Sequence, residues 1–132
     1  MSILVLNLGS TSFKFELFDS KNLASLRKGV YELKLKSDSD LQTEVNKIFR
    51  EALRVIGDTS EIEVIGHRFV HGGDEFEETS LVTPEVIDAL EKINDLAPLH
   101  NPYNLAGIKA SLEYLPEIKN YAIFDSNPQF FC

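Results

Sequence analysis

The sequence predicts an α/β domain in which helices flank a mixed sheet of five strands. The first observation is a set of short segments that are apolar, or alternate between apolar and polar residues, as β-strands do. These segments are residues 3–8, 13–18, 28–36, 62–70 and 120–124. The second observation is the order βββαβααβ, which is typical of helices packed against a sheet of parallel and antiparallel strands. A chain of 132 residues is long enough for one such domain with its own core.

The first three strands are expected to form an antiparallel meander. Residues 3–8 are a short apolar run suited to a buried strand, and residues 9–12 (GSTS) form a turn. Residues 13–18 alternate, which predicts a hairpin with the first strand. Alternation resumes at residues 28–36, whose apolar members are Val30, Leu33 and Leu35.

Three helices are predicted from apolar spacing and from residues that start or end helices. The first follows the capping residues Ser37, Ser39 and Asp40 and ends at Gly57. The second begins with Thr83 as its cap and Pro84 at its first position, and the third stops at Pro116. The first helix is marked by the spacing of Leu41, Val45, Ile48, Ala52 and Ile56, and the third by that of Leu105, Ile108, Leu112 and Leu115. The predicted inner face of the second helix is Val86, Leu90 and Ile93.

Composition and charge limit the kinds of molecule that the protein is expected to bind. Apolar residues make up 43% and charged residues 26% of the chain, as is ordinary for a globular protein. The net charge of −8, without a basic stripe, argues against a nucleic-acid or anionic-membrane partner. No apolar run approaches the roughly 18 residues of a membrane span, and the first residues lack the basic segment of a signal peptide. Since Cys132 is the only cysteine, no internal disulfide is expected, and the expected location is the cytoplasm.

The first segment that could bind a ligand is NLGSTSFK at residues 7–14. Its turn presents backbone N–H groups and three hydroxyls within four residues, and Lys14 adds a positive charge. Such a concave arrangement of donors favours a phosphate. The alternative interpretation of the same residues is an ordinary hairpin turn rich in small polar residues.

The second segment is GHRFVHGG at residues 66–73. Strand alternation places Arg68 and Val70 on one face and His67 on the other. A guanidinium beside an apolar surface suits a small carboxylate with a short alkyl tail. Taken alone, a strand end with an exposed arginine is the simpler interpretation.

Two further segments hold single polar residues at loop positions. In LAPLHNP at residues 96–102, prolines on either side stiffen a loop around His100, which could contact a phosphoryl oxygen or cap the following helix. Asp125 follows the last strand, at the sheet edge where ligands gather in α/β proteins. A lone carboxylate there suits hydrated Mg²⁺, although, taken alone, an N-cap or turn aspartate is the simpler interpretation.

Together these segments resemble the acetate kinase family of the acetate and sugar kinase/Hsp70/actin superfamily. The matching stretches are NLGSTSFKFELFD at 7–19, GHRFVHGG at 66–73, LAPLHNP at 96–102 and IFD at 123–125. They occur in the family's order and extend over nearly the whole chain. The resemblance implies a ribonuclease H-like fold, that of the actin-like ATPases.

The resemblance also implies roles for individual residues. The acyl substrate would be bound by Arg68, with Val70 and Leu99 lining the pocket for its methyl group. On the nucleotide side, the ATP phosphates would be approached by Lys14, Ser10 and Ser12, and Asn7 would help to hold magnesium. The catalytic residues implied are Asp125, Arg68 and His100.

The implied reaction is reversible phosphoryl transfer from ATP to acetate, giving acetyl phosphate and ADP. The implied metal is Mg²⁺, with Mn²⁺ as an alternative, and ATP is the co-substrate. Propionate kinase is an alternative by the same resemblance. Another alternative is a non-catalytic module that binds a carboxylate or phosphate, or a fragment that depends on a partner.

The resemblance covers only an N-terminal domain, residues 1–132, and the family pattern breaks after Asp125. In the family a second domain supplies the nucleotide pocket and most contacts between the two subunits of the homodimer. The sequence therefore leads us to expect a truncated chain that is inactive alone. A natural short protein that pairs with a separate chain is the competing interpretation.

Overall fold

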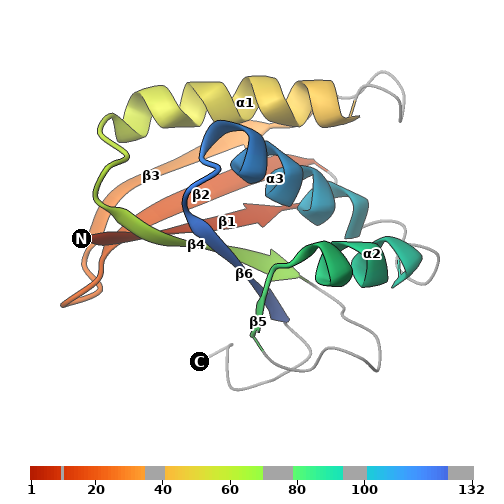
Figure 1. The fold of residues 1–132 in the computed structure, drawn as a ribbon. Coiled ribbons are helices and arrows are strands. Elements are labelled where there is room, and N and C mark those ends of the chain that lie inside the picture. Colours follow the sequence, from red (N-terminus) through yellow and green to blue (C-terminus); the bar gives the residue numbers. More distant parts are fainter. Residues whose placement is uncertain (10, 35–40, 70–78, 94–100, 125–132) are drawn as a thin grey trace.

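The structure is a computed structural model that describes residues 1–9, 11–34, 41–69, 79–93 and 101–124. Its strands are β1 (Ser2–Leu8), β2 (Ser12–Asp19), β3 (Ser25–Glu32), β4 (Ile62–Phe69), β5 (Ser80–Leu81) and β6 (Lys119–Phe124). Its helices are α1 (Leu41–Ile56), α2 (Pro84–Ile93) and α3 (Asn101–Tyr114). Six strands form a single sheet in the order β3-β2-β1-β4-β6-β5 (Figure 1).

The sheet is mixed, as the sequence predicted. β1, β2 and β3 form the expected antiparallel meander. β4 pairs in parallel with β1 on one side and with β6 on the other. The predicted number of five strands was wrong, because the two-residue strand β5 adds an antiparallel edge to β6.

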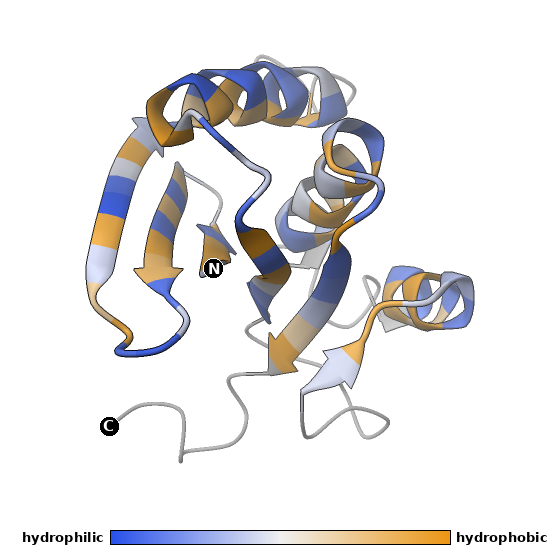
Figure 2. Ribbon diagram, turned by 60° about the vertical axis from the view of Figure 1, so that its left-hand side comes forward, coloured by the Kyte–Doolittle hydropathy of each residue, from blue (hydrophilic) through white to orange (hydrophobic). Residues whose placement is uncertain are grey.

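Helices α1 and α3 cover one face of the sheet (Figure 1). Strand alternation selects this face, because every second residue of β1 and β2 is buried beneath the helices. In Figure 2 the alternation appears as orange and blue bands along the strands. An aromatic group ties the layers together, since Phe49 of α1 lies 6.3 Å from Phe13 of β2 and 5.9 Å from Tyr114 of α3, measured between ring centroids.

The sequence predicted α1 closely, and the reason lies in its ends and its spacing. Apolar residues recur on one face over the whole helix, and that face is buried. The helix ends at Gly57, which has a φ of +80°, and the N–H of Gly57 donates to the carbonyl of Leu53 over 2.9 Å. Glycine adopts this left-handed conformation without the strain that a Cβ atom causes.

Helices α2 and α3 follow the prediction in part. The hydroxyl of Thr83 accepts a hydrogen bond from the N–H of Val86 over 3.2 Å, so Thr83 caps α2 as expected. Leu90 of α2 packs with Leu105 and Ile108 of α3 in a small buried cluster. Leu112, one of the residues whose spacing predicted α3, lies one turn beyond this cluster and is 38% exposed.

Strand β3 begins and ends earlier than residues 28–36. Its pairing places Phe13 opposite Tyr31 and Phe15 opposite Gly29, so Tyr31 and Gly29 lie on the face that the helices cover. Val30 therefore points away from the core and is 69% exposed, whereas Leu33, just after the strand, is buried. No helix in the described part of the chain is long and apolar enough to cross a membrane.

Gly29 leaves space for an aromatic ring beneath β3. A Cβ atom added at Gly29 would lie 2.5 Å from Cε1 of Phe15, whose ring stacks on Tyr31 with centroids 6.2 Å apart. That separation is shorter than a van der Waals contact, so the ring or the edge strand must move. Phe15 is 97% shielded from solvent, which leaves the ring little room.

We expect Gly29→Ala to destabilise the fold by about 1–3 kcal/mol, the usual cost of overpacking a core. Urea unfolding at neutral pH measures the change. Gly9→Ala is the matched control, because a Cβ at Gly9 meets nothing within 4 Å. Adding Phe15→Leu to Gly29→Ala should recover part of the loss, and equal stability of Gly29→Ala and Gly9→Ala would contradict this account.

Candidate functional site

The face of the sheet that points away from α1 and α3 brings together three of the predicted site residues. Asn7 on β1 lies opposite Lys14 on β2. Arg68 directly follows His67, which lies opposite Leu6, the residue before Asn7. Arg68, Asn7 and Lys14 therefore form a row across three neighbouring strands, each about 4.8 Å from the next.

These side chains line an open groove of about 520 Å³. Its polar lining comes from Asn7, Lys14, Glu16, Lys28 and Arg68, and apolar side chains of β1, β2 and β3 complete it. Three cations and one carboxylate thus face the groove from the described residues. The combination suits an anion that also presents an apolar surface.

The turn between β1 and β2 lies at the end of this groove next to Asn7. Within the turn, the N–H of Gly9 donates to the carbonyl of Ser12 over 2.9 Å. The carbonyl of Thr11 accepts the N–H of Leu33 over 2.9 Å, which fastens the turn to the end of β3. The N–H of Gly9 is therefore engaged inside the turn, and a phosphate there would need the other donors.

Beneath Arg68, on the helix-covered side, His67 and Asn120 form a buried polar pair. Nε2 of His67 and Oδ1 of Asn120 are 2.7 Å apart and join β4 to β6. Nδ2 of Asn120 donates to the carbonyl of Ile118 over 3.1 Å, so Oδ1 is the acceptor and Nε2 of His67 holds the proton. Nδ1 of His67 faces α3, where a Cβ added at Gly107 would lie 3.8 Å away.

Burial sets the charge state of His67. Burial lowers the pKa of His67 to about 4, and the hydrogen bond that His67 donates to Asn120 opposes that effect. His67 is therefore neutral at pH 7, and its hydrogen bond locks β4 against β6 directly below the Arg68–Ile123 pair. The sequence analysis placed His67 on this face and missed Asn120, which stands in a strand of otherwise mostly apolar residues.

Five predicted site residues lie outside the described part of the chain: Ser10, Val70, Leu99, His100 and Asp125. Ser12 is the first residue of β2 and lies, by alternation, on the same face as Lys14. Lys28 lines the groove and was missed, because its position on that face depends on the register of β3 with β2. The roles of all these residues remain predictions.

The described residues contain no group of three or more His, Cys, Asp or Glu side chains arranged to hold a metal ion. Asn7 offers one amide oxygen to the groove, and Mg²⁺ commonly takes few protein ligands and completes its shell with water and phosphate oxygens. The groove therefore fits a magnesium ion that arrives with a phosphate ligand.

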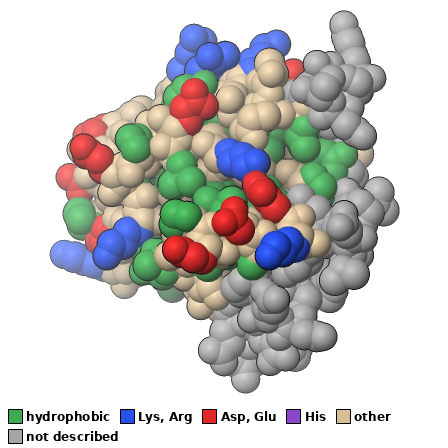
Figure 3. All heavy atoms as spheres, turned by 45° about the vertical axis from the view of Figure 1, so that its right-hand side comes forward, with side chains coloured by type: hydrophobic (Ala, Val, Ile, Leu, Met, Phe, Trp, Pro, Cys, Tyr) green, Lys and Arg blue, Asp and Glu red, His purple; other side chains and the backbone are tan. Residues whose placement is uncertain are grey.

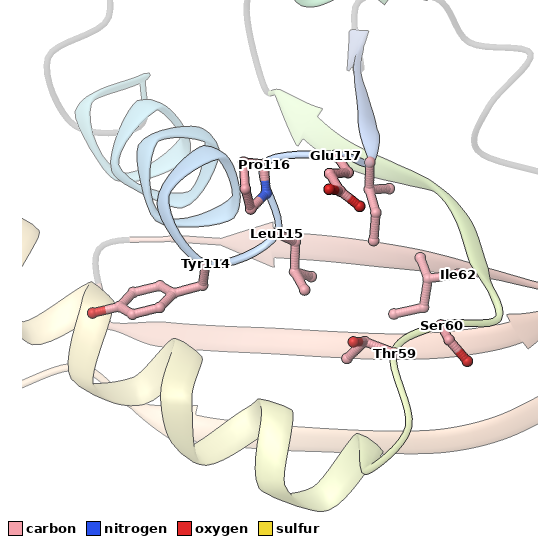
Figure 4. A pocket seen from close by; sticks show the side chains of 8 residues that line it. Thr59, Ser60, Ile62, Tyr114, Leu115, Pro116 and Glu117 are labelled. Carbon is pink, nitrogen blue, oxygen red and sulfur yellow. The ribbon is translucent and has the colours of Figure 1, made fainter.

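A second hollow of about 470 Å³ lies at the opposite end of β4, between the end of α3 and the residues that lead into the strand (Figure 4). Tyr114, Leu115 and Ile62 give it an apolar lining, and Glu117 is its charged side chain. Without a cation, this hollow offers an anion no favourable partner, so the groove beside Arg68 is the candidate site.

Because His67 is neutral in the folded chain, stability should depend on pH. The unfolded state binds a proton at His67 below about pH 6.5, whereas the folded state binds it only near pH 4, so stability is full above pH 6.5 and falls as the pH drops. We expect His67 to account for a loss of about 3 kcal/mol between pH 7 and pH 4.

Urea unfolding from pH 7 to pH 4.5, for the unmodified chain and His67→Gln, tests this expectation. Glutamine retains an N–H that can reach Asn120 but does not titrate in this range. His67→Gln should be less stable at pH 7 and lose less stability on acidification. Identical slopes for the two proteins would show that His67 does not titrate as described.

Comparisons with known proteins identify the family and the fold of this chain. The model of the acetokinase family matches residues 31–131. The acetate kinase of Coprothermobacter proteolyticus is 41% identical over 96% of this chain and 37% of its own length. Crystal structures of Porphyromonas gingivalis acetate kinase (31% identity, TM-score 0.73) and of a Francisella tularensis propionate kinase (30% identity, TM-score 0.75) each match 94% of this chain.

The same matches cover only part of each relative. The chain spans 37% of the C. proteolyticus protein and of the P. gingivalis structure, and 36% of the F. tularensis structure. The similarity in structure confirms the predicted α/β fold, that of the actin-like ATPases. With the family model matching more than half of the chain, the protein belongs to the acetokinase family.

Proposed function

We propose that this chain forms the acyl-binding part of an acetate kinase, which transfers a phosphoryl group reversibly between ATP and acetate. The observation on which the proposal rests is the row of Arg68, Asn7 and Lys14 in one groove of an acetokinase-family chain. One guanidinium, one amide and one ammonium group on adjacent strands can bind two anions side by side, here the carboxylate of acetate and a phosphate of ATP. Phosphoryl transfer depends mainly on such positioning and on charge neutralisation.

In this proposal Arg68 binds the carboxylate of acetate. Its guanidinium can donate two parallel hydrogen bonds to a carboxylate, which fixes the orientation of the substrate. Because a carboxyl group with a pKa near ~4 is already ionised at neutral pH, the attacking oxygen needs no general base. Val70 and Leu99 are proposed to contact the methyl group.

Lys14 is proposed to neutralise the phosphates of ATP, with the hydroxyls of Ser10 and Ser12 as further donors. Asn7, between Lys14 and Arg68, is proposed to contribute an oxygen to Mg²⁺. When bound, the magnesium ion would neutralise phosphate charge. His100 is proposed to contact the transferring phosphoryl group and Asp125 to act through charge near the metal.

The remaining features of the proposal concern the whole enzyme. Since the chain spans 37% of its relative, we propose that residues 1–132 correspond to the N-terminal domain and that a second domain supplies the nucleotide pocket. A cytoplasmic location and a homodimer formed mainly through the second domain belong to the same proposal.

Propionate is the alternative acyl substrate, because a propionate kinase of known structure is about as similar to this chain as the acetate kinase is. The two acids differ by one methylene, which a pocket typically discriminates by about 1–3 kcal/mol. The ratio of kcat/KM for acetate and propionate, measured in the chimeric enzyme described below, decides between them. A non-catalytic module that binds a carboxylate or phosphate is the other alternative.

The role of Arg68 can be tested in a chimera in which residues 1–124 replace the matching segment of the C. proteolyticus acetate kinase. We expect Arg68→Ala to lower kcat/KM for acetate about 100-fold, because it removes charge-assisted hydrogen bonds worth about 1.5–3 kcal/mol. Formation of acetyl phosphate is measured by trapping it with hydroxylamine.

Arg68→Lys should recover only part of this activity, since lysine cannot donate in parallel. Arg27→Ala is the matched control, because Arg27 is exposed on β3 and does not line the groove. If Arg68→Ala and Arg27→Ala had the same activity, Arg68 would not bind the acyl substrate. A chimera that folds but has no activity would count against the proposed function itself.

The 132-residue chain by itself should form no measurable acetyl phosphate from ATP and acetate. The groove is lined by residues of one domain, whereas the nucleotide pocket is proposed to lie in another domain. The same trapping assay on the purified chain measures this, with calorimetric titration of acetate and Mg-ATP as a check on binding. Turnover like that of the chimera would show that the chain is sufficient.

A further inference from the structure

Lys28 lines the groove but has no role in the proposed reaction. It lies on β3 opposite Glu16, and Val30 lies opposite Lys14. Lys28 and Lys14 are therefore diagonal neighbours on the same face of adjacent strands, about 7–8 Å apart. Both ammonium groups can reach the same part of the groove.

Lys14 and Lys28 do not form ion pairs within the described part of the chain. None of the ion pairs between described residues includes Lys14, Lys28 or Glu16. Glu16 lies across from Lys28, yet it is a single carboxylate in a groove with three cations. Two neighbouring lysines repel each other, and an anion placed between them relieves that repulsion.

This grouping contrasts with the chain as a whole, whose net charge is −8. The side of the molecule in Figure 3 shows acidic and basic side chains interspersed. The groove instead gathers cations from three strands: Arg68 of β4, Lys14 of β2 and Lys28 of β3. A concave surface lined by charges of one sign attracts ligands of the opposite charge.

We propose that Lys28 extends the phosphate site along β2 and β3, so that the groove binds a linear oligophosphate in preference to a single phosphate. The inference rests on the proposed role of Lys14 as a phosphate ligand. A single phosphate occupies the space beside one cation, whereas a chain of phosphoryl groups contacts Lys14 and Lys28 together. The ligand class includes both inorganic tripolyphosphate and the triphosphate of a nucleotide.

The test is calorimetric titration of the purified 132-residue chain with orthophosphate, tripolyphosphate and ATP at low ionic strength, where exposed charges are least screened. We expect tripolyphosphate to bind more tightly than orthophosphate. Lys28→Gln should weaken tripolyphosphate binding about fivefold, as expected for one charge-assisted contact, and change orthophosphate binding less than twofold. Lys28→Arg, which keeps the charge, should bind tripolyphosphate like the unmodified chain.

Lys34→Gln is the matched control, because Lys34 follows the same strand, is highly exposed and lies outside the groove. Comparison of ATP with tripolyphosphate separates the two sources of the ligand: equal sensitivity to Lys28→Gln places the nucleotide's phosphates in this groove. Thermal unfolding confirms that each variant is folded.

An equal effect of Lys28→Gln and Lys34→Gln on tripolyphosphate binding would overturn the inference, as would failure of the unmodified chain to bind tripolyphosphate. If Lys14→Gln weakens binding while Lys28→Gln does not, the inference fails and the proposed function stands. The chimeric kinase assay with Arg68→Ala is independent of these titrations, so failure of the proposed function is seen separately.

Discussion

The parallel pairing of β4 with both β1 and β6 is the constraint on which the rest of the molecule depends. It places β4 in the interior of the sheet, so that its successive residues face opposite environments. His67 points beneath the helices and becomes a buried, neutral hydrogen-bond donor. Arg68, one residue later, points into the groove with Asn7 and Lys14. A shift of one residue in this register would exchange the two faces, burying the guanidinium and exposing the imidazole.

The sequence was sufficient to predict which face of the sheet a residue occupies wherever a short-range pattern determines that face. Alternation in β4 assigned Arg68 and His67 to opposite faces, and the cap at Thr83 and the glycine at Gly57 gave the helix ends. Contacts between distant segments were harder to predict. Asn120 pairs with His67 only because β6 lies beside β4 in one register, and Lys28 enters the groove only through the register of β3. Leu112 is exposed because the cluster formed with α2 ends one turn before it, and helical spacing alone does not reveal where a neighbouring helix stops.

Family membership and the geometry of the groove support different parts of the functional argument. Membership comes from a match over residues 31–131, and the proposed class of chemistry rests on it. The groove indicates which of this chain's side chains lie together: the described members come from β1, β2, β3 and β4, and they combine positive charge with an apolar floor. Because the chain spans 37% of its relative, the groove is proposed to form one side of the active site, with the other side in a second domain.

Strand β3 forms one end of the six-stranded sheet, and this position has a consequence for self-association. The outer backbone groups of an edge strand are a template on which another chain can add a strand. β3 carries the adjacent cations Arg27 and Lys28 at its centre, and two copies approaching edge to edge would bring these charges together. At the other end of the sheet, β5 has only two residues and offers little backbone for such pairing. Both edge strands thus disfavour the addition of a strand from another molecule. In β3 the reason is positive charge, and in β5 it is the short length of the strand.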